Sequence, residues 1–310
     1  MRKFEVYLLG RFFVGRRGRN SISFGCAKSQ ELLAFLLINR NRTLRRDWIA
    51  TELWDDPSRA TPRKNLRHAL WKLQNALGEV HDELALFIRS DGPDWIRCEP
   101  PDNLWWDVAA LESAHAILCR RSADSLSTQE AEALEEVVDI YAGQFLDGCD
   151  QHWCLIERER LRDYYTAILD ALTDHCILTK NFDKGIAFAH RNLREDYARE
   201  QTHQRLMSLY ALAGDRTAAL RQFARCDKAL RSEFDVEPSR ATMALRDVVR
   251  MDRLGDRLPV VGSGTHSIGG RTDAGSCTDL LVELRNLLWE LSHTISGGPL
   301  DAERGTAKAE

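Results

Sequence analysis

A helix predicted over residues 60–77 places cationic and aromatic side chains opposite an apolar stripe. Leucines at helical spacing form the stripe, which would face a core: Leu66, Leu70, Leu73 and Leu77. At about 3.6 residues per turn, the opposite side and its flanks carry charged, amide and ring groups: Arg63, Lys64, Arg67, His68, Trp71, Lys72 and Asn75. Such groups can bind phosphates and hydrogen-bond to base edges in the major groove of DNA. An ordinary solvated amphipathic helix has the same pattern, so the neighbouring elements decide between the two interpretations.

The flanking segments predict the elements that would position this helix. Alternation, turn residues and helix-end signals give this order: strands at 4–9, 12–14 and 21–24, helices at 29–38, 47–54 and 60–77, then strands at 86–89 and 95–98 around a turn at 90–94. Ser29 is the predicted cap of the first helix, Pro62 fits the first turn of the basic helix, and Gly78 ends it. Two helices, a basic third helix and a hairpin predict a winged helix-turn-helix.

Further cations lie beside these elements, and phosphate contacts are expected from them. Arg45 and Arg46 precede the second helix, and Arg89 and Arg97 occupy the two strands of the hairpin. Residues 1–100 contain 18 Lys and Arg against 12 Asp and Glu, whereas the rest of the chain contains 25 against 35. This asymmetry favours a polyanion-binding head on a protein-facing body, although chance drift in surface charge can also produce it.

The basic run from Arg63 to Gly78 resembles the recognition helix of the OmpR-type DNA-binding domain in Streptomyces-antibiotic-regulatory-protein-like activators. Leu8-Leu9-Gly10 and Glu52-Leu53-Trp54 also match that family. Two departures stand out. The family usually has Arg-Arg where this chain has Gln74-Asn75, which would weaken phosphate contact at the helix end. Its wing usually carries a Gly-Tyr-Arg-Leu-like sequence, whereas this chain has Gly92-Pro93-Asp94-Trp95-Ile96, in which Trp95 could take the Tyr position after a short insertion.

From Trp106 onward the chain is predicted to be almost continuous helix with short breaks. Residues 141–148, followed by Trp153 and residues 157–161, resemble the bacterial transcriptional activation domain. Residues 180–186 match 214–220 at an offset of 34, the tetratricopeptide period, with small Gly185 and Ala219 where paired helices approach. The resemblance to the activator family covers roughly residues 3–250.

The predicted fold is mainly α, with an N-terminal α+β winged helix-turn-helix followed by an all-α, tetratricopeptide-like domain. Four parts are expected: a DNA-binding domain at 1–103, a helical activation domain at 104–252, a flexible linker at 253–277, and an amphipathic helix with a disordered tail at 278–310. The helix predicted at 278–295 has one apolar face that could dock on the body or on a second subunit, and docking in cis is the simpler expectation.

The sequence gives little support for other classes of protein, such as metalloproteins, enzymes or membrane proteins. The eight cysteines form no C-x-x-C pair, as is typical of reduced thiols in a cytosolic protein. Cys149, His152 and Cys154 lie close in sequence, but no second ligand cluster completes a four-ligand set, so neither a metal nor another cofactor is expected. Zincin, serine-hydrolase and dinucleotide motifs are missing, so the chain is not expected to be an enzyme. No secretory signal and no apolar run of membrane-spanning length is found, and no membrane partner is expected.

Residues and resemblance together predict a cytoplasmic, sequence-specific DNA-binding transcriptional activator. Its winged helix would bind repeats in double-stranded promoter DNA, and the resemblance implies a helical body that forms a homodimer or contacts RNA polymerase. Groove contacts are expected from the basic helix, namely Arg63, Lys64, Arg67, His68, Trp71 and Lys72, and phosphate contacts from Arg45, Arg46, Arg89 and Arg97. The alternative is a helical-repeat interaction scaffold whose winged helix no longer binds specific DNA. The departures at Gln74, Asn75 and the wing favour it, and the basic head disfavours it.

Overall fold

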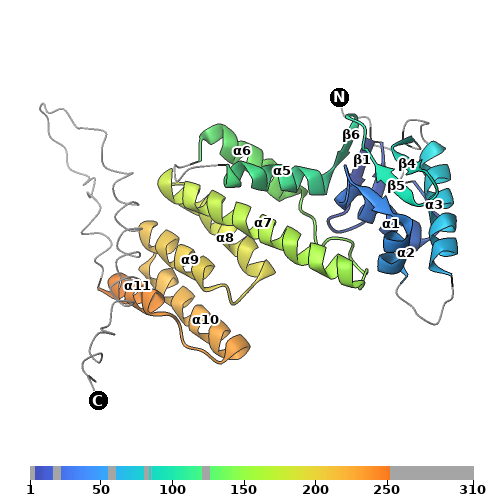
Figure 1. Ribbon diagram of the computed structural model, residues 1–310. Coiled ribbons are helices and arrows are strands. Elements are labelled where there is room, and N and C mark those ends of the chain that lie inside the picture. Colours follow the sequence, from blue (N-terminus) through green and yellow to red (C-terminus); the bar gives the residue numbers. More distant parts are fainter. Residues whose placement is uncertain are drawn as a thin grey trace, which may run out of the picture. The chain divides into compact units, whose positions relative to one another are not determined.

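The computed structural model describes residues 4–16, 22–54, 61–79, 84, 86–120 and 126–251 (Figure 1). The chain divides into two compact units, Met1–Ile168 and Leu169–Glu310. The linker predicted at 253–277 and the helix predicted at 278–295 lie outside the described residues. The predicted boundary between residues 103 and 104 also stays a prediction.

The first unit contains the strands and the helices around them. In chain order they are β1 (Phe4–Tyr7), β2 (Phe13–Gly15), α1 (Ala27–Ile38), β3 (Thr43–Arg45), α2 (Arg46–Leu53), α3 (Pro62–Gly78), β4 (Ile88–Asp91), β5 (Trp95–Cys98), β6 (Leu104–Trp106), α5 (Asp107–Cys119), α6 (Thr128–Ile140) and the first part of α7 (His152–Leu178). One sheet has the order β2-β1-β6, with β1 and β6 parallel, and the other has the antiparallel order β3-β5-β4. The predicted winged helix with an N-terminal sheet is confirmed.

Two local predictions about the first unit are wrong. Residues 22–24 form no strand, although the Ile22 N–H donates to the Val14 carbonyl at 2.7 Å. Ser29 does not cap α1, because the helix already begins at Ala27 and its N-cap position is Cys26. The Ser29 side chain is fully buried instead, and its hydroxyl donates to the Ala69 carbonyl on α3 at 3.4 Å. The hydroxyl thus joins α1 to α3 where an unpaired polar group would be costly.

The segment Leu8-Leu9-Gly10 meets residues 141–148 at a backbone junction. Leu9 and Phe145 form an antiparallel bridge, and the Gly10 N–H donates to the Gln144 carbonyl at 2.8 Å. Gly10 has a φ of +88°, and a Cβ added at Gly143 would lie 3.2 Å from the Gly10 Cα. Glycine is therefore required at both positions, one for conformation and one for close approach. Two sequence motifs more than 130 residues apart thus form one packing contact.

Buried Asp107, the first residue of α5, binds the segment that directly follows β1. Its carboxylate accepts the N–H groups of Leu8, Leu9 and Val108, each at 2.7 Å. Burial raises the pKa of Asp107 to about 6, against the lowering effect of these backbone hydrogen bonds. The carboxyl thus satisfies the N–H groups of Leu8 and Leu9 and one N–H at the N-terminus of α5, where a negative charge is favourable.

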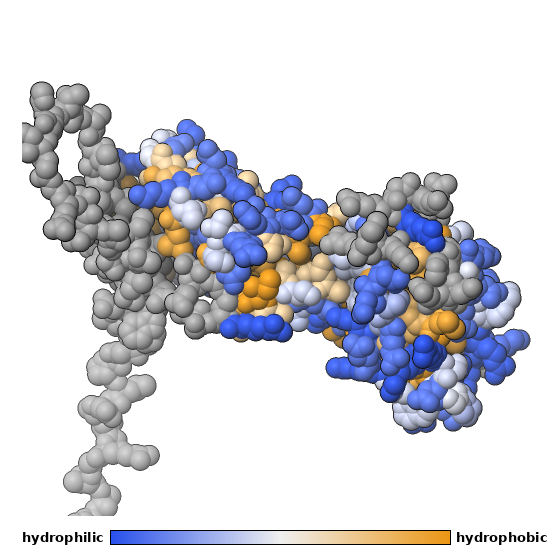
Figure 2. All heavy atoms as spheres, turned by 90° about the horizontal axis from the view of Figure 1, so that it is seen from above, coloured by the Kyte–Doolittle hydropathy of each residue, from blue (hydrophilic) through white to orange (hydrophobic). Residues whose placement is uncertain are grey.

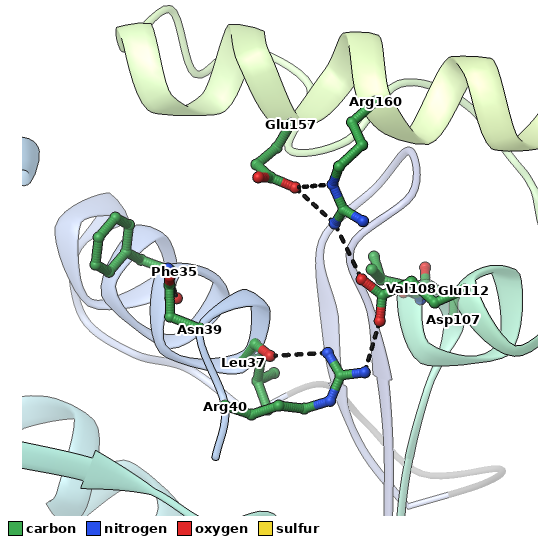
Figure 3. Close-up of polar contacts among 9 residues, drawn as sticks. All are labelled: Phe35, Leu37, Asn39, Arg40, Asp107, Val108, Glu112, Glu157 and Arg160. Atoms are coloured by element: carbon green, nitrogen blue, oxygen red, sulfur yellow. Dashed lines mark hydrogen bonds and ion pairs between the residues drawn. The ribbon is translucent and has the colours of Figure 1, made fainter. Parts of the chain in front are cut away.

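A chain of ion pairs links Arg40, just after α1, to α5 and α7 within the first unit (Figure 3). Glu112 on α5 accepts Arg40 at 2.6 Å and Arg160 at 3.0 Å, and Arg160 also pairs with Glu157 at 2.7 Å. Arg40 stacks over the Trp106 ring at 5.1 Å. Because these groups are largely shielded from water, the network is worth more than isolated surface pairs.

The second unit repeats with a period of 34 residues. It holds the rest of α7 together with α8 (Phe182–Glu195), α9 (Glu200–Leu212), α10 (Arg216–Phe234) and α11 (Arg240–Arg250). The starts of α8 and α10 are 34 residues apart, and each follows a residue with positive φ, Lys180 at +58° and Gly214 at +84°. A Cβ added at Gly185 would lie 2.9 Å from a Leu209 methyl carbon, and the equivalent Ala219 is buried. The predicted repeat is confirmed, with small residues where helices pack closely.

Among the helices built from described residues, none combines the length and apolarity needed to cross a membrane.

Candidate nucleic-acid interface

Helix α3 has one buried aliphatic side and one exposed polar side. Leu66, Leu73 and Leu77 are at most 1% exposed, and Leu70 is 6% exposed. Trp71 is 59% exposed. The residues around it on the polar side are exposed or half-buried: Arg63, Lys64, Arg67, His68, Lys72 and Asn75. This side presents fixed and rotatable N–H donors, an imidazole and an indole, which are the groups that contact phosphates and base edges.

Arg63, in the first turn of α3, is held by acidic side chains. Its Nε and Nη2 donate to the two carboxylate oxygens of Asp47 on α2, and Nη2 also lies 3.7 Å from Asp94 Oδ1 at the end of the wing turn. The hydrogen bond from Arg63 lowers the pKa of Asp47. Arg45 also reaches Asp47, at 3.8 Å. Bidentate pairing fixes the plane of the guanidinium, so the positive charge of Arg63 is shared with Asp47.

Arg46 connects α2 with the wing. Its backbone N–H donates to the Asp94 carbonyl at 2.8 Å, and its guanidinium donates to the Ser90 hydroxyl at 2.7 Å. Burial and, after it, the positive charge of Arg67 lower the pKa of Arg46. The structure therefore brings together three of the predicted cations, Arg46, Arg63 and Arg67, beside the turn between β4 and β5.

Arg89 and Arg97 form a different group. They are directly opposite each other in the β4–β5 pairing, and both are exposed. Arg97 donates to the Thr43 hydroxyl at 3.3 Å and pairs with Glu99 at 3.2 Å, while Arg89 Nε donates to the Leu86 carbonyl at 2.9 Å. Like charges opposite each other on one face of a sheet repel, and a bound phosphate would relieve that repulsion.

Gln74, one of the departures from the family pattern, is not a free group at the helix end. Its amide donates to the Ile88 carbonyl on β4 at 3.1 Å. The side chain thus joins α3 to the first strand of the wing, whereas its neighbour Asn75 is exposed. An arginine at position 74 would have to give up this contact to reach a phosphate.

The acidic partners of the cationic face were not anticipated from the sequence. Asp47 and Asp94 reach Arg63 from α2 and from the wing turn, and Ser90 reaches Arg46. No local spacing links these residues, because their proximity depends on how the helices and the hairpin pack. In the sequence, an acid in the first turn of α2 is equally well explained by its favourable interaction with the helix N-terminus, without any arginine partner.

Hydrophilic side chains cover most of the visible face of the winged-helix end, where apolar ones gather in small patches (Figure 2).

Residues 106–250 match the family model of the bacterial transcriptional activator domain. Among solved structures, the chain is similar to Mycobacterium tuberculosis EmbR in complex with a low-affinity phosphopeptide. The TM-score is 0.65 at 20% sequence identity, and the match covers 93% of this chain and 71% of that chain. At this identity the likeness shows a shared fold. No curated protein sequence matches the chain.

Proposed function

We propose that the chain is a cytoplasmic activator that binds promoter DNA sequence-specifically, because residues 106–250 match the family model of the bacterial transcriptional activator domain. The chain is similar to Streptomyces-antibiotic-regulatory-protein-like regulators in its activator domain and in its fold. The observation that carries the proposal is the cationic and aromatic side of α3, set opposite a fully buried leucine stripe in a winged helix.

In this proposal α3 occupies the major groove. Lys64, Arg67, His68, Trp71 and Lys72 face bases or nearby phosphates, and Arg63 does so while paired with Asp47. Arg45 and Arg46 at the start of α2, with Arg89 and Arg97 on the wing, contact the backbone. The helical body forms a homodimer or contacts RNA polymerase, as the family resemblance implies.

The test is selection from a random-sequence duplex DNA library by the full chain, followed by sequencing. We expect the wild-type protein to enrich a motif with two half-sites, and a Lys64→Ala/Arg67→Ala variant to lose that enrichment. A matched control removes the same charge from exposed positions of α10, in an Arg221→Ala/Lys228→Ala variant. Enrichment should persist in the control.

The second candidate, a scaffold that no longer binds specific DNA, is favoured by one observation: Gln74 is engaged with the wing strand at the position where the family usually has a cation. Under this alternative the wild-type chain would enrich no sequence. Its residual DNA binding would then depend equally on the cations of α3 and of α10.

A further inference from the structure

Trp71 exposes a large apolar ring on the polar side of α3. The side chain is 59% exposed, whereas nearby Leu70 and Leu73 are buried in the leucine stripe. Single apolar side chains are common on protein surfaces, so this exposure has meaning only through what surrounds the ring. The groups that share its side of the helix decide what the ring can bind.

Helical geometry places Trp71 at the centre of this polar side. At about 100° per residue, Lys64, Arg67 and Asn75 project within about 60° of the direction of Trp71. The ring centroid of His68, one turn earlier, lies 6.3 Å from that of Trp71, and the two ring planes are inclined by 30°. Because the centre of a recognition helix's exposed side enters the groove most deeply, the indole would meet base edges before it meets the phosphates at the rims.

The cations of α3 end one residue after Trp71. Residues 73–79 contain no Lys or Arg, Gln74 is bound to β4, and Asn75 carries no charge. Attraction to phosphates is therefore concentrated before this point of the helix. Contact with bases is what the side chains from Trp71 onward can add.

The Trp71 indole offers a broad apolar face and one N–H donor. Among the base edges in the major groove, the apolar feature is the thymine 5-methyl group, whereas the other edges present hydrogen-bond donors and acceptors. Covering those polar groups with a ring that cannot pair with them removes their water at a cost, while covering a methyl group is favourable. The ring therefore favours thymine over the other bases at the position that it covers.

We propose that Trp71 selects thymine at one position of each half-site, by packing its indole on the thymine 5-methyl group in the major groove. The inference rests on the proposed DNA-binding function and adds a base identity to it. Because the methyl group is what the ring recognises, removal of that methyl alone should weaken binding, without any change in base pairing.

The experiment uses the full chain and the duplex that it selects from a random-sequence library. Each thymine of that duplex is replaced singly by deoxyuridine, which lacks the methyl group but keeps the pairing and hydrogen-bonding groups. Fluorescence anisotropy compares the affinities. We expect one thymine in each half-site at which the replacement weakens binding roughly fourfold, the effect of one buried methyl group. With Trp71→Ala, the same replacement should leave the affinity unchanged.

Phe234→Ala is the matched control, because it removes a ring of similar exposure, 60%, from the end of α10. This variant should keep the deoxyuridine sensitivity of the wild-type protein. Thermal unfolding checks that both variants are folded.

A wild-type protein that selects a motif without thymine, or that is insensitive to every replacement, would overturn the proposal, and this measurement needs no variant. Equal sensitivity of Trp71→Ala and the wild-type protein would also overturn it, because another residue would then read the methyl group. Each of these results leaves an enriched motif, and with it the proposed function, in place. If the wild-type chain enriches no sequence at all, the proposed function fails and this inference fails with it.

Discussion

Asp47, in the first turn of α2, holds the guanidinium of Arg63 in a bidentate ion pair at the start of α3. The acid thus lies beside the surface that is proposed to meet DNA. In that proposal, the carboxylate repels phosphates and also orients the arginine that faces them. The pair therefore favours directed recognition over general attraction to the DNA backbone.

Asp47→Asn should raise affinity for non-specific duplex DNA, because Arg63 is released and a repelling charge is lost. The slope of log K against log salt should steepen by about one phosphate contact. Fluorescence anisotropy across a salt series measures both effects. Asp183→Asn is the matched control, because Asp183 is likewise an exposed acid in the first turn of a helix, α8. Equal slopes for the Asp47 variant and the wild-type protein would contradict the prediction.

Arg67→Ala should weaken binding to the selected sequence by about 1–3 kcal/mol and flatten sequence preference, if Arg67 contacts a base edge. Lys72→Ala offers a comparison on the same helix, because a side chain that only touches phosphate lowers affinity on all sequences alike. Gel shifts on the selected sequence and on a scrambled duplex separate the two outcomes. A similar loss on both duplexes for Arg67→Ala would show that this arginine does not read bases.

Regular spacing is what made much of the fold predictable. The leucines of α3 and the 34-residue repeat behind α8 and α10 appear in the sequence as periods, and the structure has helices at both places. Strands β3 and β6 have three residues each and were not predicted. They form because of distant partners, as when β6 pairs with β1 from about 100 residues away. Local sequence carries no signal for such pairing.

The polar contacts of the candidate site were predictable only in part, for the same reason. The exposed cations of α3 followed from helical geometry, since each position on a helix has a calculable direction. Their partners did not, because Asp47 and Asp94 reach Arg63 from other elements. The predicted role of Ser29 was wrong for a related reason. A serine near a helix start predicts an N-cap, but this hydroxyl donates to the Ala69 carbonyl on α3.

Gln74→Ala should lower the free energy of unfolding by about 1 kcal/mol, because the Ile88 carbonyl loses its donor. Asn75→Ala is the matched control. Its exposed side chain lies next along the same helix, and the change should stay within about 0.5 kcal/mol. Urea unfolding followed by tryptophan fluorescence measures both variants. Equal stabilities would show that the bond between α3 and the wing strand contributes nothing.

Gly143→Ala should destabilise the first unit by about 1–3 kcal/mol, since the new methyl group would meet the Gly10 backbone, which cannot rotate away as a side chain can. The bridge between Leu9 and Phe145 should open with it. Amide hydrogen exchange at Gly10 and Leu146 reports on that opening, because both N–H groups donate across the junction. Unchanged protection at these two amides would contradict the packing argument.

The raised pKa of Asp107 predicts a specific pH dependence of the free energy of unfolding. Its pKa in the folded chain is about 6, above its ordinary value of 3.8, so the folded state binds the proton more tightly. The stability that this carboxyl contributes is complete below about pH 4 and is lost as the pH rises through about 6, by roughly 3 kcal/mol at most. Urea unfolding of the wild-type protein and of Asp107→Asn, between pH 4 and pH 7, isolates the effect. The wild-type free energy of unfolding minus that of the variant should fall with rising pH. If that difference rises instead, the three backbone N–H groups outweigh burial and hold the pKa of Asp107 below its ordinary value.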